Sequence, residues 1–220
     1  MAKANTLARR SIALKTTPAF GKLHLGDVKR PNVEALRKRI SPTDDARVEL
    51  RQGDCHSRAE AIIKEFPQRG TLALAFVDPE GFEVRFDLFR TFKQRPIDIL
   101  FLFPSGIGVR RNLERFARSN RHTLMDGLWG GREWRALPVV KRLIGDHNAA
   151  EAGTLDQSWA TEFCKRVATL GYVYYDASPP LCNETNVPMY HLLFFSKHEA
   201  GLAIWRGISK IQPNGQRRLW

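Results

Sequence analysis

Cysteines and long apolar runs are both scarce in this chain. Its three cysteines, Cys55, Cys164 and Cys182, lie far apart and form no Cys-x-x-Cys pair, which excludes a disulfide framework and an obvious zinc site. No histidine, cysteine and carboxylate residues show the spacing of metal ligands, so we expect no metal centre. The longest apolar run, residues 97–104, contains Asp98 and has the length of a strand, so we expect no membrane span.

Signatures of several protein classes are missing as well. The sequence has no Walker loop and no Gly-x-Ser-x-Gly elbow, which disfavours a P-loop enzyme and a serine hydrolase. No known nucleic-acid-binding motif is present. The first 20 residues contain no apolar signal core, so we expect a cytoplasmic protein.

Positive charge, in contrast, is abundant. The 220 residues carry a net charge of +12, and 43% of them are hydrophobic, enough for a packed core. The excess lies in residues 1–39, with ten Lys or Arg against two acids, and in residues 85–121, with nine against three. Such clusters attract phosphate groups, so nucleic acid is a candidate partner; a solvated basic surface is the alternative.

Strand-like and helix-like segments alternate along the chain. Strands are predicted over residues 23–28, 48–54, 71–77, 97–103, 172–176 and 189–196. Helices are predicted over residues 31–40, 56–66, 84–94, 109–119, 154–170 and 199–210, with an ordered loop over 121–137. This order predicts one α/β domain over residues 1–220, with a mostly parallel sheet and helices on both faces. Residues 1–20 form a basic N-terminal segment, and residues 212–220 are expected to be a disordered tail.

Polar residues follow four of the predicted strands. Asp27, Asp54, Asp78 and Ser105 each stand at a predicted carboxyl end. Because ligands of parallel sheets bind beyond the carboxyl ends of the strands, we expect these four to share one rim around a cleft. Asp27 could accept hydrogen bonds from ribose hydroxyls, and Asp54, followed by Cys55, could contact a base.

Two further segments could bind an anion. Gly106-Ile107-Gly108 opens a helix and could cradle a phosphate; a plain tight turn is the alternative. His198 could be a base or a phosphate contact, or could cap the following helix. The candidate substrate-binding or phosphate-binding residues are Ser105, Arg110, Arg111, Asn112, Lys197 and His198.

Three motifs in order resemble the three-Cys-motif partner protein (TcmP) family. They are Phe76–Gly81, then Ile97–Pro104 with Arg111-Asn112, then Tyr190–His198 with Gly201–Trp205, and the resemblance runs from about residue 11 to 211. The loop Asp78-Pro79-Glu80-Gly81 is also reminiscent of the Asp-Pro-Pro-aromatic loop of amino-group methyltransferases, although such tetrapeptides also form ordinary turns. Glu80 replaces the aromatic residue usual in the family.

The resemblance implies a Rossmann-like fold of the class I, S-adenosylmethionine-dependent methyltransferase type. It places Asp78, Pro79, Glu80 and Gly81 in a catalytic loop and assigns S-adenosylmethionine to Asp27, Asp54 and Cys55. It also implies a partner protein that carries a three-cysteine motif. The family's first strand ends in a glycine-rich turn and lies between the strands that end at Asp27 and Asp78.

Residues 1–20 supply neither that strand nor that turn, and residues 10–14 look like the segment just after it. The sequence thus resembles a truncated family member, and we expect it to bind S-adenosylmethionine weakly and to be inactive as encoded. The alternative function is a non-catalytic basic module that binds nucleic acid or a protein partner.

Overall fold

The structure is a computed structural model that describes residues 13–41, 44, 46–67, 70–144 and 152–209. The predicted tail and most of the basic N-terminal segment lie outside these residues. The chain divides into two compact units, residues 1–65 (unit 1) and residues 66–220 (unit 2), and we describe each by itself.

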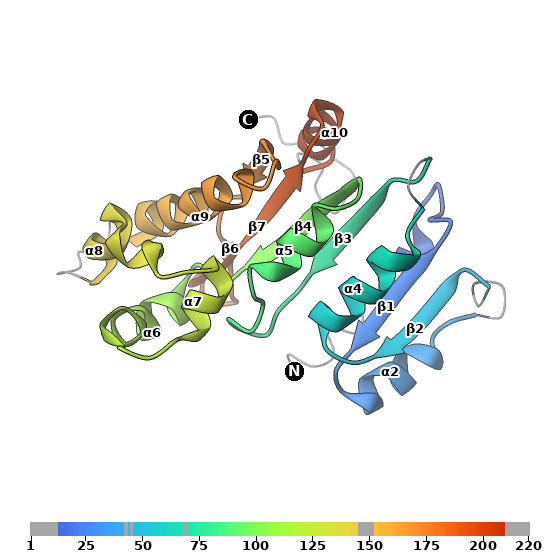
Figure 1. The fold of residues 1–220 in the computed structure, drawn as a ribbon, viewed down its shortest axis with the longest axis horizontal. Coiled ribbons are helices and arrows are strands. Elements are labelled where there is room, and N and C mark those ends of the chain that lie inside the picture. Colours follow the sequence, from blue (N-terminus) through green and yellow to red (C-terminus); the bar gives the residue numbers. More distant parts are fainter. Residues whose placement is uncertain (1–12, 42–43, 45, 68–69, 145–151, 210–220) are drawn as a thin grey trace. The chain divides into compact units, whose positions relative to one another are not determined.

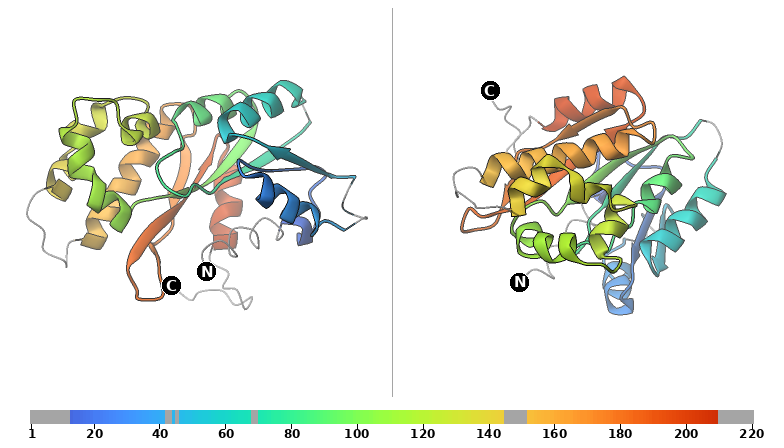
Figure 2. Two further views of the ribbon diagram at one scale, coloured as in Figure 1. Left: turned by 90° about the horizontal axis from the view of Figure 1, so that it is seen from below. Right: turned by 60° about the vertical axis from the view of Figure 1, so that its left-hand side comes forward.

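Unit 1 is built on two parallel strands. Its elements are η1 (Ala13–Lys15), β1 (Leu23–Asp27), α2 (Arg30–Arg37), β2 (Val48–Gln52) and α4 (Cys55–Glu65). The pairing runs from Leu23 opposite Val48 to Asp27 opposite Gln52, and α2 and α4 lie on opposite faces of the pair (Figures 1 and 2). Helix α2 starts as predicted, with a proline in its first turn, and buries Val33.

Unit 2 contains five more strands and most of the helices. Its elements are β3 (Ala73–Val77), α5 (Asp87–Phe92), β4 (Ile97–Phe103), α6 (Ile107–Arg118), α7 (Leu124–Trp129), η2 (Glu133–Ala136), α8 (Pro138–Ile144), α9 (Ala152–Ala168), β5 (Tyr174–Ala177), β6 (Leu181–Cys182), β7 (Pro188–Ser196) and α10 (Glu199–Ser209). The strand order is β3-β4-β7-β5, with β6 paired to β7 (Figure 1).

The prediction of an α/β protein is confirmed, but the larger sheet is mixed. Strands β3 and β4 are parallel, as are β1 and β2, whereas β7 runs antiparallel to β4, β5 and β6. Only short connections join β5, β6 and β7, and such connections favour antiparallel neighbours because a parallel pair needs a long crossover. The prediction of a mostly parallel arrangement is therefore wrong for the C-terminal strands.

Aromatic side chains fill the core of unit 2 on both faces of its sheet. Phe101 of β4 contacts Phe89 of α5 and Phe163 of α9, with ring centroids 5.3 and 5.6 Å apart. On the opposite face, Phe194 of β7 stacks on Trp205 of α10 at 5.4 Å. Helices α5 and α9 thus cover one face and α10 the other, as Figure 2 shows. Each buried phenylalanine contributes about 1.5–3 kcal/mol.

Two helix predictions need correction. The predicted helix over residues 84–94 begins only at Asp87, because the N–H of Phe86 donates to the carbonyl oxygen of Gly127 at 2.9 Å instead of entering a helical turn. The predicted loop over residues 121–137 contains α7 and η2, and α8 follows directly. These helices are four to seven residues long, too short for a clear helical periodicity.

Strand β3 lies in an apolar run, residues 71–77, which is typical of a central parallel strand buried on both faces. Instead it ends the row of paired strands, and among the described strands it pairs with β4 alone. Leu72, Leu74 and Phe76 are exposed by 87%, 45% and 49%. Within the described part of the chain, no helix has both the length and the apolar character needed to cross a membrane.

Candidate functional site

The carboxyl edge of the β1–β2 pair brings two predicted acids together in unit 1. Asp27 ends β1 opposite Gln52, and Asp54 follows two residues later. The N–H of Gly53 donates to the carbonyl oxygen of Asp27 at 3.0 Å, which ties the two strand ends to each other. The edge therefore presents two half-buried or exposed carboxylates beyond adjacent parallel strands, the position where open α/β sheets bind ligands.

Gly53 sets the direction of the chain between β2 and α4. Its φ of +139° lies in a region that side chains other than glycine rarely adopt. A Cβ atom at this position would also meet the guanidinium group of Arg58, 2.7 Å from its Nε. This turn places Asp54 immediately before the first turn of α4.

Asp54 caps α4. Its Oδ1 accepts hydrogen bonds from the backbone N–H groups of His56 at 3.0 Å and Ser57 at 3.3 Å. Burial alone would raise the pKa of the Asp54 carboxyl group, but these bonds and one from the His56 ring outweigh it and hold the pKa below its usual value. Asp54 is therefore ionised at neutral pH, and its side chain is 55% exposed. Asp27 forms a similar turn, since its Oδ1 accepts from the N–H of Lys29 at 2.8 Å.

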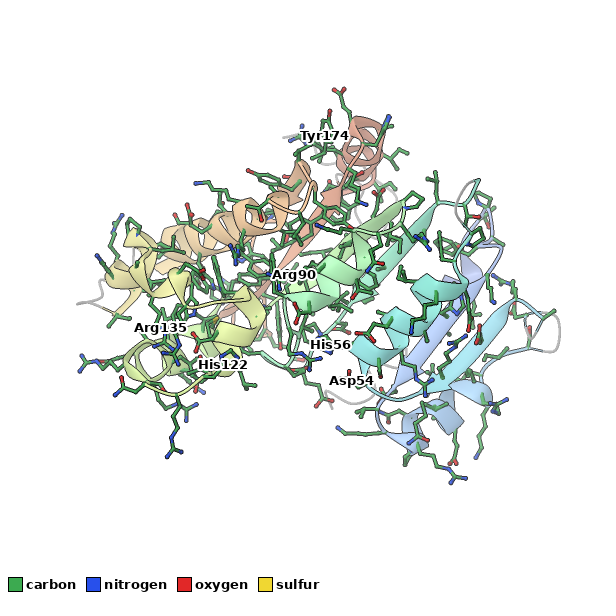
Figure 3. All side chains as sticks on the ribbon, viewed as in Figure 1. Asp54, His56, Arg90, His122, Arg135 and Tyr174 are labelled. Atoms are coloured by element: carbon green, nitrogen blue, oxygen red, sulfur yellow. The ribbon has the colours of Figure 1, made fainter. Side chains whose placement is uncertain are left out.

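Three metal-ligating side chains converge at the start of α4, a cluster that sequence analysis missed. The Nδ1 atom of His56 lies 3.2 Å from Oδ1 of Asp54 and 3.4 Å from Sγ of Cys55. One ligand atom from each residue can be chosen so that all lie within 4.8 Å of one another. Figure 3 labels Asp54 and His56, which lie close together at this helix start.

His56 is buried, and only 5% of the residue is exposed. The capping turn at Asp54 directs the ring inward, and nothing in the residue spacing reveals that turn.

The predicted catalytic loop follows β3 in unit 2. Pro79 is buried and Glu80 is exposed, and the N–H of Glu80 donates to Oε1 of Glu83 at 2.6 Å. Asp78 and Gly81 are both half-buried. The aromatic residue next to this loop, Phe82, packs edge-on against Phe116 of α6, with ring centroids 5.9 Å apart. The loop and the residues just after it are thus held by Glu83 and by the packing of Phe82 on α6.

Ser105 belongs to a buried hydrogen-bond network. Its hydroxyl lies 2.5 Å from Nδ1 of His191, whose Nε2 lies 3.0 Å from Oε1 of Gln157. Ser105 and His191 are exposed by 1% and 0%, and burial lowers the pKa of His191 to about 4. Both side chains face the interior and bond to each other within the protein, and the contact of Ser105 with substrate or phosphate stays a prediction.

The glycine turn before α6 is shaped by the backbone beside it. The N–H of Gly106 donates to the carbonyl oxygen of Met189 at 3.1 Å, so this group is not available to an anion. Asn112 donates to the carbonyl oxygen of Gly108 at 2.9 Å and accepts from Arg115 at 2.7 Å. Arg111 is exposed on the helix surface. The side chain of Arg110 lies outside the described part of the chain.

Lys197 and His198 lie at the other edge of the sheet from Ser105. Strand β7 runs antiparallel to β4, so its carboxyl end meets the start of β4. Nζ of Lys197 donates to the carbonyl oxygens of Lys93 and Arg95 at 2.5 and 2.8 Å. Nδ1 of His198 accepts from the N–H of Ala200 at 3.2 Å and so caps α10, the alternative given above. These two residues and Ser105 therefore do not share one edge of the sheet.

The predicted rim is therefore realised as two pairs of strand ends, one in each unit. Unit 1 brings together Asp27 and Asp54, with Cys55 and the unpredicted His56. Unit 2 places Asp78 and Ser105 after the parallel strands β3 and β4.

A scan against models of known protein families finds no match for this chain, and a search of curated proteins finds none either. The argument for a function therefore rests on the residues of the two units.

Proposed function

We propose that the chain is a TcmP-like protein of the class I methyltransferase type, and that the carboxyl edge of unit 1 binds the nucleoside part of S-adenosylmethionine. The observation that carries the proposal is the pairing of β1 with β2, which sets Asp27 and Asp54 beyond neighbouring parallel strands. In each residue Oδ1 accepts a hydrogen bond from a nearby backbone N–H group, which fixes the carboxylate beside the end of its strand.

The two acids suit different parts of a nucleoside. A carboxylate that ends a strand of a nucleotide-binding sheet accepts hydrogen bonds from ribose hydroxyls, and we assign this role to Asp27. Asp54 then accepts from the amino group of the base, beside Cys55. Hydrogen bonds to a charged group contribute about 1.5–3 kcal/mol each, so either acid should matter measurably.

The strand pairing supports the methyltransferase part of the proposal. Among the described strands β1 pairs with β2 alone and β3 with β4 alone, so each keeps one unpaired edge. The resemblance predicts such unpaired edges on β1 and β3, because the family's first strand, which would pair with both, is missing from the 220 residues. The last strand, β7, is antiparallel and precedes α10, and the Asp78–Gly81 loop follows a parallel strand. The same proposal includes a partner protein that carries a three-cysteine motif and a cytoplasmic location.

The 220 residues contain no glycine-rich turn to hold the methionine part of the cofactor. We therefore expect weak binding that depends on the nucleoside, and no methyl transfer by this chain. Calorimetry with S-adenosylmethionine and with adenosine should give similar weak affinities. The Asp27→Ala and Asp54→Ala variants should each weaken binding about tenfold or more, as the loss of one charged hydrogen bond implies.

Asp87→Ala is the matched control, because Asp87 is also an exposed aspartate, 65% accessible, but belongs to α5 of unit 2. It should leave the affinity unchanged. Tight binding of S-adenosylmethionine to the unaltered chain, or equal losses in all three variants, would contradict the proposal.

A second candidate function, phosphate-backbone binding, is favoured by one face of α6. Arg111, Arg115 and Arg118 follow one another at helical spacing and are exposed. Arg115 is bonded to Asn112, and Arg118 forms an ion pair with Glu114 at 2.7 Å, which ties up part of their charge. Arg111 lies nearest the start of the helix, where backbone N–H groups add positive potential.

Nucleic-acid binding should then weaken steeply with salt, with a log–log slope of about −0.7 to −0.9 per phosphate neutralised. Replacing Arg110 and Arg111 together by Ala should weaken binding more than replacing Arg115 and Arg118 together. Filter binding across salt concentrations measures both effects. A flat salt response, or equal losses from the two double variants, would leave the arginines as a solvated surface.

A further inference from the structure

We propose that Asp54, Cys55 and His56 bind a zinc ion at the start of α4. The three side chains offer one carboxylate oxygen, one thiolate sulfur and one imidazole nitrogen, the donor types that zinc accepts in proteins. Three protein ligands leave the fourth position of a tetrahedral ion for water or another ligand. The inference goes beyond the nucleoside-binding proposal, which assigns no metal to the chain.

The spacing of the ligand atoms fits a shared ion. Zinc bonds of about 2.0–2.3 Å in a tetrahedral arrangement place neighbouring ligand atoms roughly 3.3–3.6 Å apart. His56 Nδ1 lies 3.4 Å from Cys55 Sγ and 3.4 Å from Asp54 Oδ2. Two of the three ligand pairs therefore already lie at ligand-to-ligand distances. The ligand atoms of Asp54 and Cys55 lie within 4.8 Å of each other, and rotation of these two exposed side chains would bring them onto a shared ion.

The same distances argue against a proton relay between these residues. In a nucleophile–histidine–acid relay, the acid and the nucleophile contact different nitrogens of the ring. Here both Asp54 and Cys55 approach the one atom Nδ1 of His56. A single ring nitrogen cannot pass a proton from one to the other, whereas convergence on one point is what a common ion requires.

Burial of the His56 ring and the capping of α4 by Asp54 hold two of the ligands near their binding positions. The His56 ring is almost fully buried and held in place, while Asp54 and Cys55 are exposed and open the cluster to solvent. Oδ1 of Asp54 caps α4, so Oδ2 can bind the ion without loss of the cap. One ligand is therefore fixed by the fold, and the other two can adjust.

The positive charge around the site means that a cation can bind only if negatively charged ligands compensate it. The start of α4 carries a partial positive charge, and the guanidinium group of Arg58 lies beside Gly53, so both oppose an uncompensated cation. A thiolate and a carboxylate supply two negative charges, which neutralise a divalent ion. The mixed set of nitrogen, oxygen and sulfur donors disfavours Mg²⁺ and Ca²⁺, which prefer oxygen ligands.

Cobalt(II) absorption spectroscopy on the full chain, without nucleoside, tests the proposal. Co²⁺ bound by a thiolate gives a charge-transfer band, and tetrahedral coordination gives intense visible bands; added Zn²⁺ should remove both. The bands should appear with the unaltered protein and be abolished in Cys55→Ser. They should persist in Cys182→Ser, the matched control, because Cys182, like Cys55, is an exposed cysteine outside any disulfide.

His56→Asn should also lose the visible bands, with circular dichroism to show that this buried substitution still folds. Cys55→Ser changes an exposed residue and decides the question if His56→Asn does not fold. Absence of both band types in the unaltered protein, or a charge-transfer band that survives in Cys55→Ser, would overturn the zinc site. Since no nucleoside is present, such a result leaves the nucleoside-binding proposal standing, and failure of nucleoside binding leaves the zinc site standing.

Discussion

A single buried carboxylate, that of Asp126, organises the segment in which the sequence shows no periodicity. Thr123 and Asp126 cap α7 reciprocally, with N–H to oxygen distances of 2.8 and 3.2 Å. The indole N–H of Trp134 and the guanidinium of Arg135 also donate to this carboxylate, at 2.9 and 2.7 Å. Burial by itself raises the pKa of Asp126, but these hydrogen bonds outweigh it and the net pKa is lowered.

Asp126→Ala should therefore destabilise the protein by about 3–5 kcal/mol, because it removes the buried carboxylate that pairs with Arg135 and accepts from the indole N–H of Trp134. Glu114→Ala is the comparison, since it removes an ion pair between side chains that are 55% and 75% exposed. Such exposed pairs contribute about 0–1 kcal/mol. Urea unfolding measures both, and similar losses in the two variants would contradict the assigned role of Asp126.

His191 should make stability depend on pH. Its folded pKa is about 4 against an ordinary value of 6.5, so the unfolded chain takes up the proton first as the pH falls. The stabilisation is complete above pH 6.5 and is lost progressively towards pH 4, by about 3 kcal/mol in total. Urea unfolding of the parent at pH 7 and pH 4 should show this loss of stability. The His191→Gln variant should lose less stability between the two pH values, because it lacks the contribution of His191. An unchanged pH dependence in the variant would argue against a neutral, buried His191.

At the scale of elements, Gly106 fixes how α6 starts against β7. A Cβ atom at this position would lie 2.0 Å from the carbonyl oxygen of Pro188, a backbone atom that cannot move aside without shifting the strand. Gly108, two residues later, has no heavy atom within 4 Å of its Cβ position. The two glycines thus form a matched pair within one helix.

Gly106→Ala should cost about 3 kcal/mol or more, at or above the usual range for overpacking, because the clash is with backbone. Gly108→Ala should instead stabilise α6 by about 0.5–1 kcal/mol, since alanine loses less conformational freedom in a helix. Thermal unfolding of the two variants checks the signs. A stable Gly106→Ala protein would show that the turn does not approach β7 as described.

The elements that the sequence predicts well are those with strong local patterns. The apolar run of β4 gives its bounds, 97–103, and β7 and α10 start within one residue of their predicted positions. The direction of β7 could not be read, because an apolar strand looks the same in either direction. Its antiparallel direction places Lys197 and His198 at the opposite edge of the sheet from Ser105.

In the candidate site, too, features with a local sequence pattern were predicted and features that depend on three-dimensional contacts were not. The edge with Asp27 and Asp54 was predicted because strand ends and helix starts are marked in the sequence. The burial of His56 was missed because it depends on the capping turn of Asp54, and the burial of Ser105 was missed because its partner His191 lies 86 residues away. Side-chain direction at a strand end depends on contacts that local patterns do not contain.

At the scale of the whole molecule, the chain consists of two units that each carry one parallel strand pair followed by polar residues. The central claim concerns unit 1, in which the β1–β2 edge binds a nucleoside. The claim requires that ligand contacts gather around two short stretches, residues 26–28 and 53–56, which are separated in sequence and joined by strand pairing.

The most direct test is a ¹H–¹⁵N NMR titration of the chain, freed of metal by a chelator, with S-adenosylmethionine up to millimolar concentration. The account predicts that amide shifts concentrate at residues 26–28 and 53–56, that residues 197–200 stay unchanged, and that Asp27→Ala abolishes the shifts. The absence of any shift, or shifts that gather elsewhere and persist in Asp27→Ala, would contradict it.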